Sequence, residues 1–411
     1  MSPAPQDSTA FAGWLASASE DDAVRVWKPN EKGAQAAPTP TTDFSLAASF
    51  RGHTDPALRV TWHTRAPDSG ILASASGDRT AQVWQLKEGE GGGQWAAVPV
   101  ASLGGHAEEV YACEFLSPPA DASPSSLRLV TASGPGLEAW EVRPDGRATR
   151  LGASPACCVG ADATTGAAST APLPPRWAAA HVFGAAAQPA TAPPTSRPLV
   201  AAACSDGALR LWACESSGRS GGAFTPLLGV RVHAGAVASS LAWAPDGRAV
   251  AVGASDGSLA LIDIRKPSVA AWRGRVGAGS GPAYGCAFVE QGGSSSGGPP
   301  LLAVAAADAA VALFNTTAGP SSPLDWLQAS RPAPHRFLCV AAGPGGSVVA
   351  AGDAVEGGGP GGVRVVGSAG EKRAVWTNEP PAAALPNPAH MPKRALWAPI
   401  TVFEPRALTS A

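Results

Sequence analysis

Charged residues are scarce in this chain, as are several residue types that other protein classes use heavily. Asp, Glu, Lys and Arg together make up 15% of the 411 residues, the formal net charge is −2, and tyrosine and methionine occur twice each. A chain so near neutrality has no overall electrostatic attraction for nucleic acid or for an anionic membrane surface. We therefore expect neither as a partner.

Signals for membrane insertion and secretion are also missing. No apolar stretch approaches the roughly 20 residues that a membrane-spanning helix needs. The opening Met1-Ser-Pro-Ala-Pro-Gln-Asp7 has neither the basic start nor the apolar core of a secretory signal. The sequence therefore predicts a protein of the cytoplasm, or of the nucleus, with a disordered N-terminus over residues 1–10.

Cysteine motifs of the metal-binding and redox kinds are absent. The seven cysteines stand at positions 113, 157, 158, 204, 214, 286 and 339 without a Cys-x-x-Cys pair, and no histidine pair has zinc-ligand spacing. We expect most of them to be small apolar strand residues in a reducing compartment. The adjacent Cys157 and Cys158 lie in a predicted loop, where a redox or metal role is the alternative. No metal or cofactor is predicted.

Turn-forming residues are abundant. Glycine occurs 48 times and proline 40 times, whereas long amphipathic helical patterns are scarce. Apolar and polar residues alternate in short runs such as 58–62 and 238–245, and the Pro-Asp-Gly at 245–247 is a turn between two runs. Composition and patterning together predict an all-β chain.

One unit recurs along the whole sequence. Residues 71–84 read Ile-Leu-Ala-Ser-Ala-Ser-Gly-Asp-Arg-Thr-Ala-Gln-Val-Trp and follow a Gly-His pair at 52–53. Asp78 stands six residues before Trp84, Ser74 stands four before Asp78, and His53 lies upstream of all three. The period of a repeat determines the fold of the whole chain, so the other copies matter.

Six further copies keep parts of this pattern, most often the Asp and a large apolar residue six positions later. The recognisable positions are, in chain order, Ser17, Asp21 and Trp27; Trp140, with Gly134 in place of the Asp; Asp206 and Trp212; Asp256 and Ile262; Asp308 and Phe314; and Asp353, before a Gly-rich insertion. The chain therefore contains seven units, of which the third and the seventh are the least regular.

The unit resembles a WD repeat. The resemblance implies a seven-bladed β-propeller whose blades are four-stranded antiparallel sheets. It also implies that the His, Ser or Thr, Asp and Trp of a blade form a buried hydrogen-bonded set, complete only in the second blade as His53, Ser74, Asp78 and Trp84. Partial sets are implied elsewhere, namely Ser17, Asp21 and Trp27; Trp140; Asp206 and Trp212; His233 and Asp256; and Asp308.

The same residue types allow a catalytic interpretation. His, Ser and Asp form hydrolase triads, but no Gly-x-Ser-x-Gly elbow accompanies them here. Three units keep the Asp while the Ser position is taken by Ala202, Val252 or Val304. A structural brace tolerates such losses, because buried polar groups that satisfy one another need no further role. With no phosphate loop and no repeating carboxylate pair either, we predict no enzymatic activity and no small-molecule substrate, a propeller enzyme being the weakest alternative.

The repeats predict a single domain over residues 11–411. Its units are expected near 11–50, 51–102, 103–150, 172–228, 229–275, 280–330 and 335–378, with low-complexity loops at 28–42, 144–175, 291–300 and 356–362. Such loops cannot bury enough surface to order themselves, and we expect them on the rim as neutral spacers or, alternatively, as binding segments. Arg25, Arg210 and Arg364 are expected to face solvent or a neighbouring blade.

The first unit lacks an innermost strand. The residues before it are too few and too rich in proline to supply one, whereas Leu396-Trp-Ala-Pro399 matches Ala242-Trp-Ala-Pro245. The closing segment 388–405 is therefore predicted to complete the first blade, and His390 is predicted to join Ser17, Asp21 and Trp27. Completing the blade removes an exposed strand edge. A disordered tail is the alternative.

Most WD-repeat proteins are non-enzymatic scaffolds, so the resemblance implies that the partners are other proteins. In this family the position before the turn Asp faces the top surface. The residues there are mostly small and uncharged: Glu20, Gly77, Ser133, Ser205, Ser255, Ala307 and Gly352. This pattern favours backbone or apolar contact with a partner over recognition of a strongly charged ligand.

A second binding hypothesis comes from the fifth unit. Residues 252–265 resemble the box by which some WD-repeat proteins dock, as substrate receptors, on a cullin-RING ubiquitin ligase adaptor. The box ends in Asp263-x-Arg265 and carries Ile262 where the family usually has Trp. The alternative function is therefore adaptor docking through Asp263 and Arg265.

Overall fold

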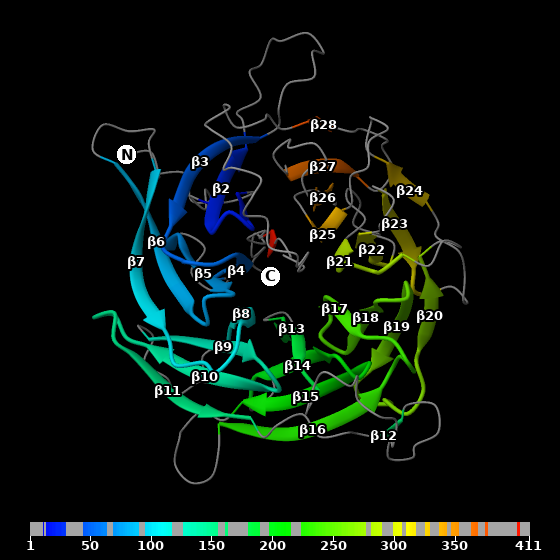
Figure 1. The fold of residues 1–411 in the computed structure, drawn as a ribbon. Coiled ribbons are helices and arrows are strands. Elements are labelled where there is room, and N and C mark those ends of the chain that lie inside the picture. Colours follow the sequence, from blue (N-terminus) through cyan, green and yellow to red (C-terminus); the bar gives the residue numbers. More distant parts are fainter. Residues whose placement is uncertain are drawn as a thin grey trace, which may run out of the picture.

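Seven β-sheets surround a common centre in the computed structural model of this chain (Figure 1). The structure describes residues 11, 14–29, 44–63, 69–89, 95–116, 126–154, 161–162, 180–189, 197–214, 223–276, 281–289, 299–305, 310–317, 325–328, 337–342, 347–352, 363–368, 375–376 and 401–402. Within each sheet, the hydrogen-bonded neighbours are strands that follow one another in sequence, apart from two additional strands described below. The predicted all-β, seven-bladed β-propeller is thereby confirmed.

The first four blades are built as follows, from the innermost strand outward. Blade one contains β29 (Thr401–Val402), β1 (Leu15–Ala18), β2 (Ala23–Pro29) and β3 (Phe44–Arg51). Blade two contains β4 (Ala57–Trp62), β5 (Ile71–Ser76), β6 (Ala81–Glu88) and β7 (Trp95–Leu103). Blade three contains β8 (Val110–Phe115), β9 (Leu127–Ser133), β10 (Gly136–Val142) and β11 (Ala148–Ala153). Blade four contains β13 (Val182–Ala187), β14 (Leu199–Cys204), β15 (Ala208–Cys214), β16 (Phe224–Arg231) and β12 (Ala161–Asp162).

The last three blades have four strands each. Blade five contains β17 (Ala238–Trp243), β18 (Ala249–Ala254), β19 (Ser258–Asp263) and β20 (Trp272–Arg275). Blade six contains β21 (Gly285–Val289), β22 (Leu301–Ala305), β23 (Ala310–Asn315) and β24 (Asp325–Gln328). Blade seven contains β25 (Phe337–Ala342), β26 (Ser347–Gly352), β27 (Val363–Ser368) and β28 (Val375–Trp376). Within the described ranges, no helix is long and apolar enough to cross a membrane.

Small and apolar residues fill the second strands of blades four and six, because these blades have a neighbour on each face. Every residue of β14 and of β22 is buried, and most of these residues are Ala, Val or Leu. Strands covered on both faces read as continuous apolar runs instead of alternating ones. The core accordingly lies between blades: one cluster joins Val130 of blade three to Val200 of blade four.

An aromatic cluster seals the contact between blades one and two. The ring of Phe11 lies 5.1 Å from Trp14, 6.0 Å from Trp62 and 5.2 Å from Trp95, measured between centroids. Aromatic pairs at such distances add stabilisation beyond the area they bury. The chain segment before β1 is therefore part of the core, in keeping with a first unit that starts at Phe11.

A β-bulge recurs in the fourth strand of the first four blades, counted from the innermost strand outward. In each blade the register of this strand shifts by one residue next to the blade tryptophan, so that one residue has no counterpart on the third strand. The four bulged residues are Ala47, Val100, Leu151 and Leu227. A bulge bends a strand and increases its twist, which suits an outer strand that must curve around the blade.

The C-terminal strand β29 pairs with β1 of blade one. Its two residues align antiparallel as Leu15 with Val402 and Ala16 with Thr401. This pairing is the one that the predicted closing segment requires, although Leu396–Pro399 and His390 lie outside the described residues. Closure of the ring over the full length of the first blade stays a prediction.

Two strands occupy a stretch that the sequence predicts to be a loop. Within residues 144–175, Ala148–Ala153 form the outermost strand of blade three, and Ala161–Asp162 pair in parallel with β16 of blade four. The loop prediction is wrong at these positions, because Ala and Gly contents mask a strand that gains its stability from pairing with β10. The unit that was expected to end at residue 150 therefore extends to Ala153. Lys28 and Pro29 likewise belong to β2 and not to the loop at 28–42.

Candidate functional site

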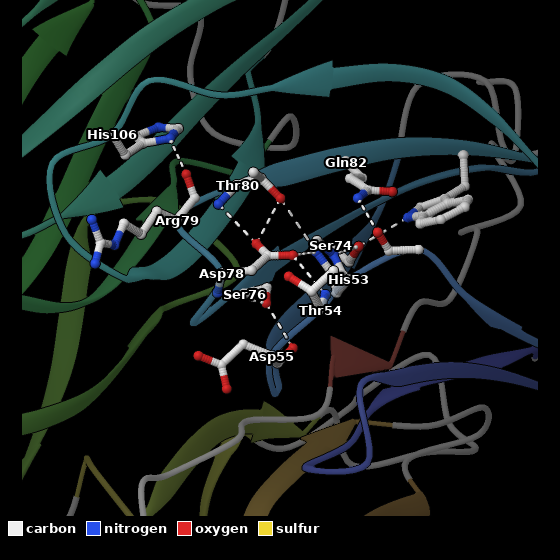
Figure 2. Close-up of polar contacts among 12 residues, drawn as sticks. His53, Thr54, Asp55, Ser74, Ser76, Asp78, Arg79, Thr80, Gln82 and His106 are labelled. Atoms are coloured by element: carbon white, nitrogen blue, oxygen red, sulfur yellow. Dashed lines mark hydrogen bonds and ion pairs between the residues drawn. The ribbon is translucent and has the colours of Figure 1, made fainter.

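His53, Ser74 and Asp78 of blade two meet in the structure (Figure 2), and a hydrogen bond from Trp84 to Ser74 extends the set. The indole N–H of Trp84 donates to Ser74 Oγ at 2.9 Å, and Ser74 Oγ lies 2.7 Å from His53 Nε2. The other ring nitrogen, His53 Nδ1, lies 2.9 Å from Asp78 Oδ2. The loop before β4 supplies the His, β5 supplies the Ser, the following turn supplies the Asp, and β6 supplies the Trp.

These four groups form a hydrogen-bond chain with a single direction. A carboxylate can only accept, so His53 Nδ1 carries the hydrogen that Asp78 receives. The neutral imidazole then accepts at Nε2 from the Ser74 hydroxyl, whose oxygen in turn accepts from Trp84. Every hydrogen along this path is used once, and bonds in such a series strengthen one another.

Burial and hydrogen bonding set the charge states of this chain. Burial lowers the pKa of His53 even though Asp78 acts in the opposite direction, so the imidazole is neutral. Burial raises the pKa of Asp78, but hydrogen bonds from Thr80, from the Thr54 backbone N–H and from His53 outweigh it and the pKa is lowered. The Asp78 carboxylate accepts from the Thr80 hydroxyl at 2.7 Å and from two backbone N–H groups at 2.9 and 3.0 Å.

This geometry differs from a hydrolase triad in what the serine can reach. Ser74 is 0% exposed, and its oxygen already accepts the Trp84 N–H. A nucleophile must present its oxygen to a substrate carbonyl beside oxyanion-stabilising donors. A serine that is enclosed between the imidazole and the indole holds the blade together and does not meet that requirement.

Blade three repeats the chain with different end groups. Trp140 donates to Thr131 Oγ1 at 3.0 Å, Thr131 lies 2.9 Å from His106 Nε2, and His106 Nδ1 lies 3.1 Å from the carbonyl oxygen of Arg79. A backbone carbonyl from the turn of blade two thus replaces the missing Asp. The sequence analysis singled out Trp140 but missed His106 and Thr131; the signal was the Gly-Gly-His at 104–106 and a Thr nine residues before the Trp.

Blades one and four use an arginine where blade two uses the histidine. In blade one, Trp27 donates to Ser17 at 3.1 Å, while Asp21 binds the Arg25 guanidinium. Burial raises the pKa of Asp21, but the hydrogen bonds with Arg25 and Ser19 outweigh it and bring the pKa to about 2. His390 lies outside the described residues.

In blade four the corresponding ion pair, between Arg210 and Asp206, is almost fully buried. Arg210 donates to the two oxygens of Asp206 at 2.9 and 2.5 Å, and the side chains are 3% and 2% exposed. The sequence analysis expected Arg25 and Arg210 to face solvent or a neighbouring blade and did not predict these ion pairs; Arg25 is partly exposed, whereas Arg210 is buried. Each arginine stands four residues after the turn Asp, and the tight turn between the two strands brings the pair together. The Arg364 side chain lies outside the description.

Blade five keeps the histidine and the Asp but joins them through a second serine. His233 Nδ1 lies 2.8 Å from Ser258 Oγ, which donates to Asp256 at 2.5 Å, and His233 Nε2 lies 3.2 Å from the Val252 carbonyl oxygen. Burial lowers the pKa of His233. A neutral imidazole has one N–H only, and here it is on Nε2 and donates to the Val252 carbonyl. Nδ1 therefore accepts, and the Ser258 hydroxyl hydrogen is shared between Nδ1 and Asp256. Asp308 of blade six lies outside the described residues, and Phe314 is buried there.

The docking pair of the alternative hypothesis lies at the end of β19. Arg265 donates to Asp263 through Nε at 2.9 Å and through Nη2 at 2.6 Å, and its side chain is 60% exposed. These bonds with Arg265 are the main reason that the pKa of Asp263 falls to about 2. The two residues therefore form a self-contained ion pair on the surface of blade five.

Loop residues add charge to the top surface of blades one to three. Besides the exposed Glu20, the half-buried Asp22 and the exposed Asp55 and Glu108 come from turns and loops beside the small residues considered above. Burial raises the pKa of Asp22, and the neighbouring Asp55 raises it further. The expectation of a mostly uncharged face considered one position per blade and missed these acids.

The cysteines behave as strand residues wherever they are described. Cys113, Cys204, Cys214 and Cys339 are buried and Cys286 is half-buried. Burial raises the pKa of the Cys113 thiol and raises that of Cys286 to about 11. Among the described residues no group of His, Cys, Asp or Glu has the geometry of a metal site. Cys157 and Cys158 lie outside the described residues.

Comparison with known proteins gives one family and two kinds of relative. The model of the WD domain, G-beta repeat, matches residues 44–85 and 224–263. Nucleoporin SEH1 of Homo sapiens and of Xenopus tropicalis is 39% identical over 77 residues, which are 18% of this chain and 18% of the relative. The match thus spans under a fifth of those relatives' length.

A solved structure resembles the fold over most of its length. The crystal structure of Saccharomyces cerevisiae Sqt1 superposes with a TM-score of 0.50 and 13% sequence identity, covering 83% of this chain and 91% of that chain. At this identity the likeness concerns the fold. The predicted resemblance to WD repeats is confirmed by the matched family model.

Proposed function

We propose that this WD-repeat propeller is a non-enzymatic scaffold that holds other proteins in a multiprotein complex. The observation that carries the proposal is that the polar residues of the repeats are used in hydrogen bonds and ion pairs within the fold. Every predicted His, Ser and Asp that the structure describes is bound within its own blade or its neighbour, and the His and Ser side chains are buried. Groups used in this way brace the sheets, and what the blades present outward is surface for contact.

The direct test is affinity purification of the tagged full chain followed by mass spectrometry. The proposal expects stable protein partners in near-stoichiometric amounts, whether the tag is placed at the N-terminus or at the C-terminus of the chain. The name nucleoporin, carried by relatives that match 18% of the chain, makes the nuclear envelope the first compartment to examine by microscopy. Recovery of the chain alone at native concentration would contradict the scaffold proposal.

The second candidate is docking on a cullin-RING ubiquitin ligase adaptor. It is favoured by the exposure of Arg265 at the end of the matched WD unit. Arg265→Ala should remove an adaptor from the purified complex without changing the melting temperature. Arg248→Ala, at an exposed position nearby in the same blade, is the matched control. Absence of an adaptor from the wild-type complex would reject this candidate and leave the scaffold proposal intact.

A further inference from the structure

Blade four carries a strand that no other described blade has. β12 lies outside β16 and pairs with it in parallel, Ala161 opposite Val230 and Asp162 opposite Arg231. The outermost strand of a sheet has unpaired N–H and C=O groups that accept a further strand. Here the chain itself shows that the β16 edge accepts one, and it occupies two of the eight positions of β16.

The bulged residue of β16 differs from its counterparts. Ala47, Val100 and Leu151 are partly buried against the apolar clusters between blades. Leu227 occupies the same position in blade four but is 52% exposed. A large apolar residue is thus uncovered on the same strand to which β12 adds.

A buried polar group lies at the other end of this edge. Arg231 is 9% exposed, and its Nε has no hydrogen-bond partner in the described structure. Unsatisfied buried polar groups are rare and costly, so their presence calls for an explanation. The residue that the chain places opposite Arg231 is an acid, Asp162.

We propose that the outer edge of β16 is a docking site for an extended, acid-bearing segment of a partner protein, which adds to the blade as a parallel strand. The proposal deepens the scaffold function and rests on it. β12 defines the register: a segment aligned with it places a small residue beside Val230 and an acidic residue beside Arg231. Three positions before its small residue, the same segment faces Leu227, where an apolar side chain gains buried area.

In strand addition, different groups of the partner segment provide affinity and selectivity. Main-chain hydrogen bonds along an added strand give affinity for any extended segment, and side-chain positions give selectivity. The apolar residue beside Leu227 and the acid beside Arg231 would distinguish the partner. In the free protein, β12 competes for two of the positions, so its removal should favour the partner.

The test uses a labelled peptide and the full chain. The probe is fluorescein-Ser-Thr-Val-Thr-Thr-Ala-Asp-Thr-Ser, in which Val stands three positions before the Ala-Asp pair. Fluorescence anisotropy should show saturable binding. Leu227→Asp should weaken it about tenfold or more, the loss expected when one apolar side chain is no longer buried. A probe with Lys in place of its Asp should bind correspondingly more weakly.

Two further variants separate the site from general stickiness. Ala161→Pro removes a backbone donor from β12 and should strengthen peptide binding, because the internal competitor is lost. Val98→Asp changes an apolar residue of 40% exposure on the outer strand of blade two and should leave binding unchanged. Unaltered melting temperatures would show that Leu227→Asp and Val98→Asp are folded.

Failure of this site and failure of the scaffold function give different results. If Leu227→Asp and wild type bind the peptide equally, or if Ala161→Pro does not bind it, the docking site is wrong. If the wild-type chain recovers no partner in affinity purification, the scaffold function is wrong whatever the peptide does. Partners that persist in the Leu227→Asp purification would leave the scaffold in place and overturn the β16 site.

Discussion

Arg210 and Asp206 form a buried ion pair across four residues of one tight turn, with both side chains almost fully shielded from water. The pair occupies the place where blade two uses a histidine. A buried ion pair is tolerated only while both charged groups are present, because removal of one leaves the other buried and uncompensated.

Removing one partner of this pair should therefore be severe. Asp206→Ala is expected to lower the free energy of unfolding by about 3 to 5 kcal/mol, measured by urea denaturation. Asp21→Ala removes the same interaction from blade one, where the Asp is 39% exposed, and should cost about 1 kcal/mol or less. Equal losses at the two sites would show that burial does not determine the strength of the pair.

The serine in the centre of blade two should be structural. Ser74→Ala leaves the Trp84 N–H and His53 Nε2 without a partner, which is expected to cost about 1–3 kcal/mol. Ser102→Ala, at an exposed position on β7, is the matched control and should cost almost nothing. An ester-hydrolysis activity that disappears in a stably folded Ser74→Ala variant would instead favour the catalytic interpretation.

Mild acid should destabilise the fold through its buried histidines. Burial lowers the pKa of His53, His106 and His233 below the unfolded value of 6.5. The folded state then binds fewer protons than the unfolded state, so this stability is complete above about pH 6.5 and is lost as the pH falls below it. Melting temperatures across this range should decline, and less so in His53→Asn than in wild type.

A left-handed backbone position recurs after the turn Asp. Gly207 and Gly257 have φ of 77° and 78°, while Asp22 and Arg79 adopt 66° and 67° at the same place. Arg79→Gly should raise the free energy of unfolding by about 1 kcal/mol, because a side chain is unfavourable there. Gly207→Ala should lower it by more, since the added carbon would meet the His233 carbonyl oxygen at 2.0 Å. A thermal shift of the same sign for both would contradict this account.

The C-terminal strand should matter for stability well beyond its length. Deleting residues 385–411 removes β29 and leaves the buried Leu15 and Ala16 without their inner partner. We expect insolubility or a large loss of thermal stability. A shorter deletion of residues 406–411 keeps β29 and should melt like the parent. A parental melting temperature for the longer deletion would support a disordered tail.

Repeat spacing predicted the fold well because offsets between Asp and Trp reflect a strand, a turn and a strand of constant length. The same spacing did not predict that Arg25 and Arg210 bind the turn Asp of their own blade. Nothing in the sequence distinguishes an arginine that faces solvent from one that bends back to bind the turn Asp. In blade two, Gln82 stands at the equivalent position and binds the Gly52 carbonyl instead.

His106 and Thr131 were missed for a related reason. The third unit is one residue shorter between Thr131 and Trp140 than the second unit is between Ser74 and Trp84. It has Gly134 in place of the turn Asp, so the unit does not look like a complete repeat. The structure supplies the acceptor from the main chain of Arg79, which no side-chain pattern can reveal. β11 was missed because its residues have low strand propensity and depend on their neighbours.

The bond from His106 to the Arg79 carbonyl also couples the stabilities of two adjacent repeats. The brace of blade three ends in the turn of blade two, so neither repeat can melt on its own without costing the other a buried bond. In a chain whose stability is a sum of repeats and the contacts between nearest neighbours, such a shared bond raises cooperativity at one junction. It also means that a change in the shape of the turn at Arg79 should weaken the hydrogen-bonded set of blade three, although that set belongs to the next repeat.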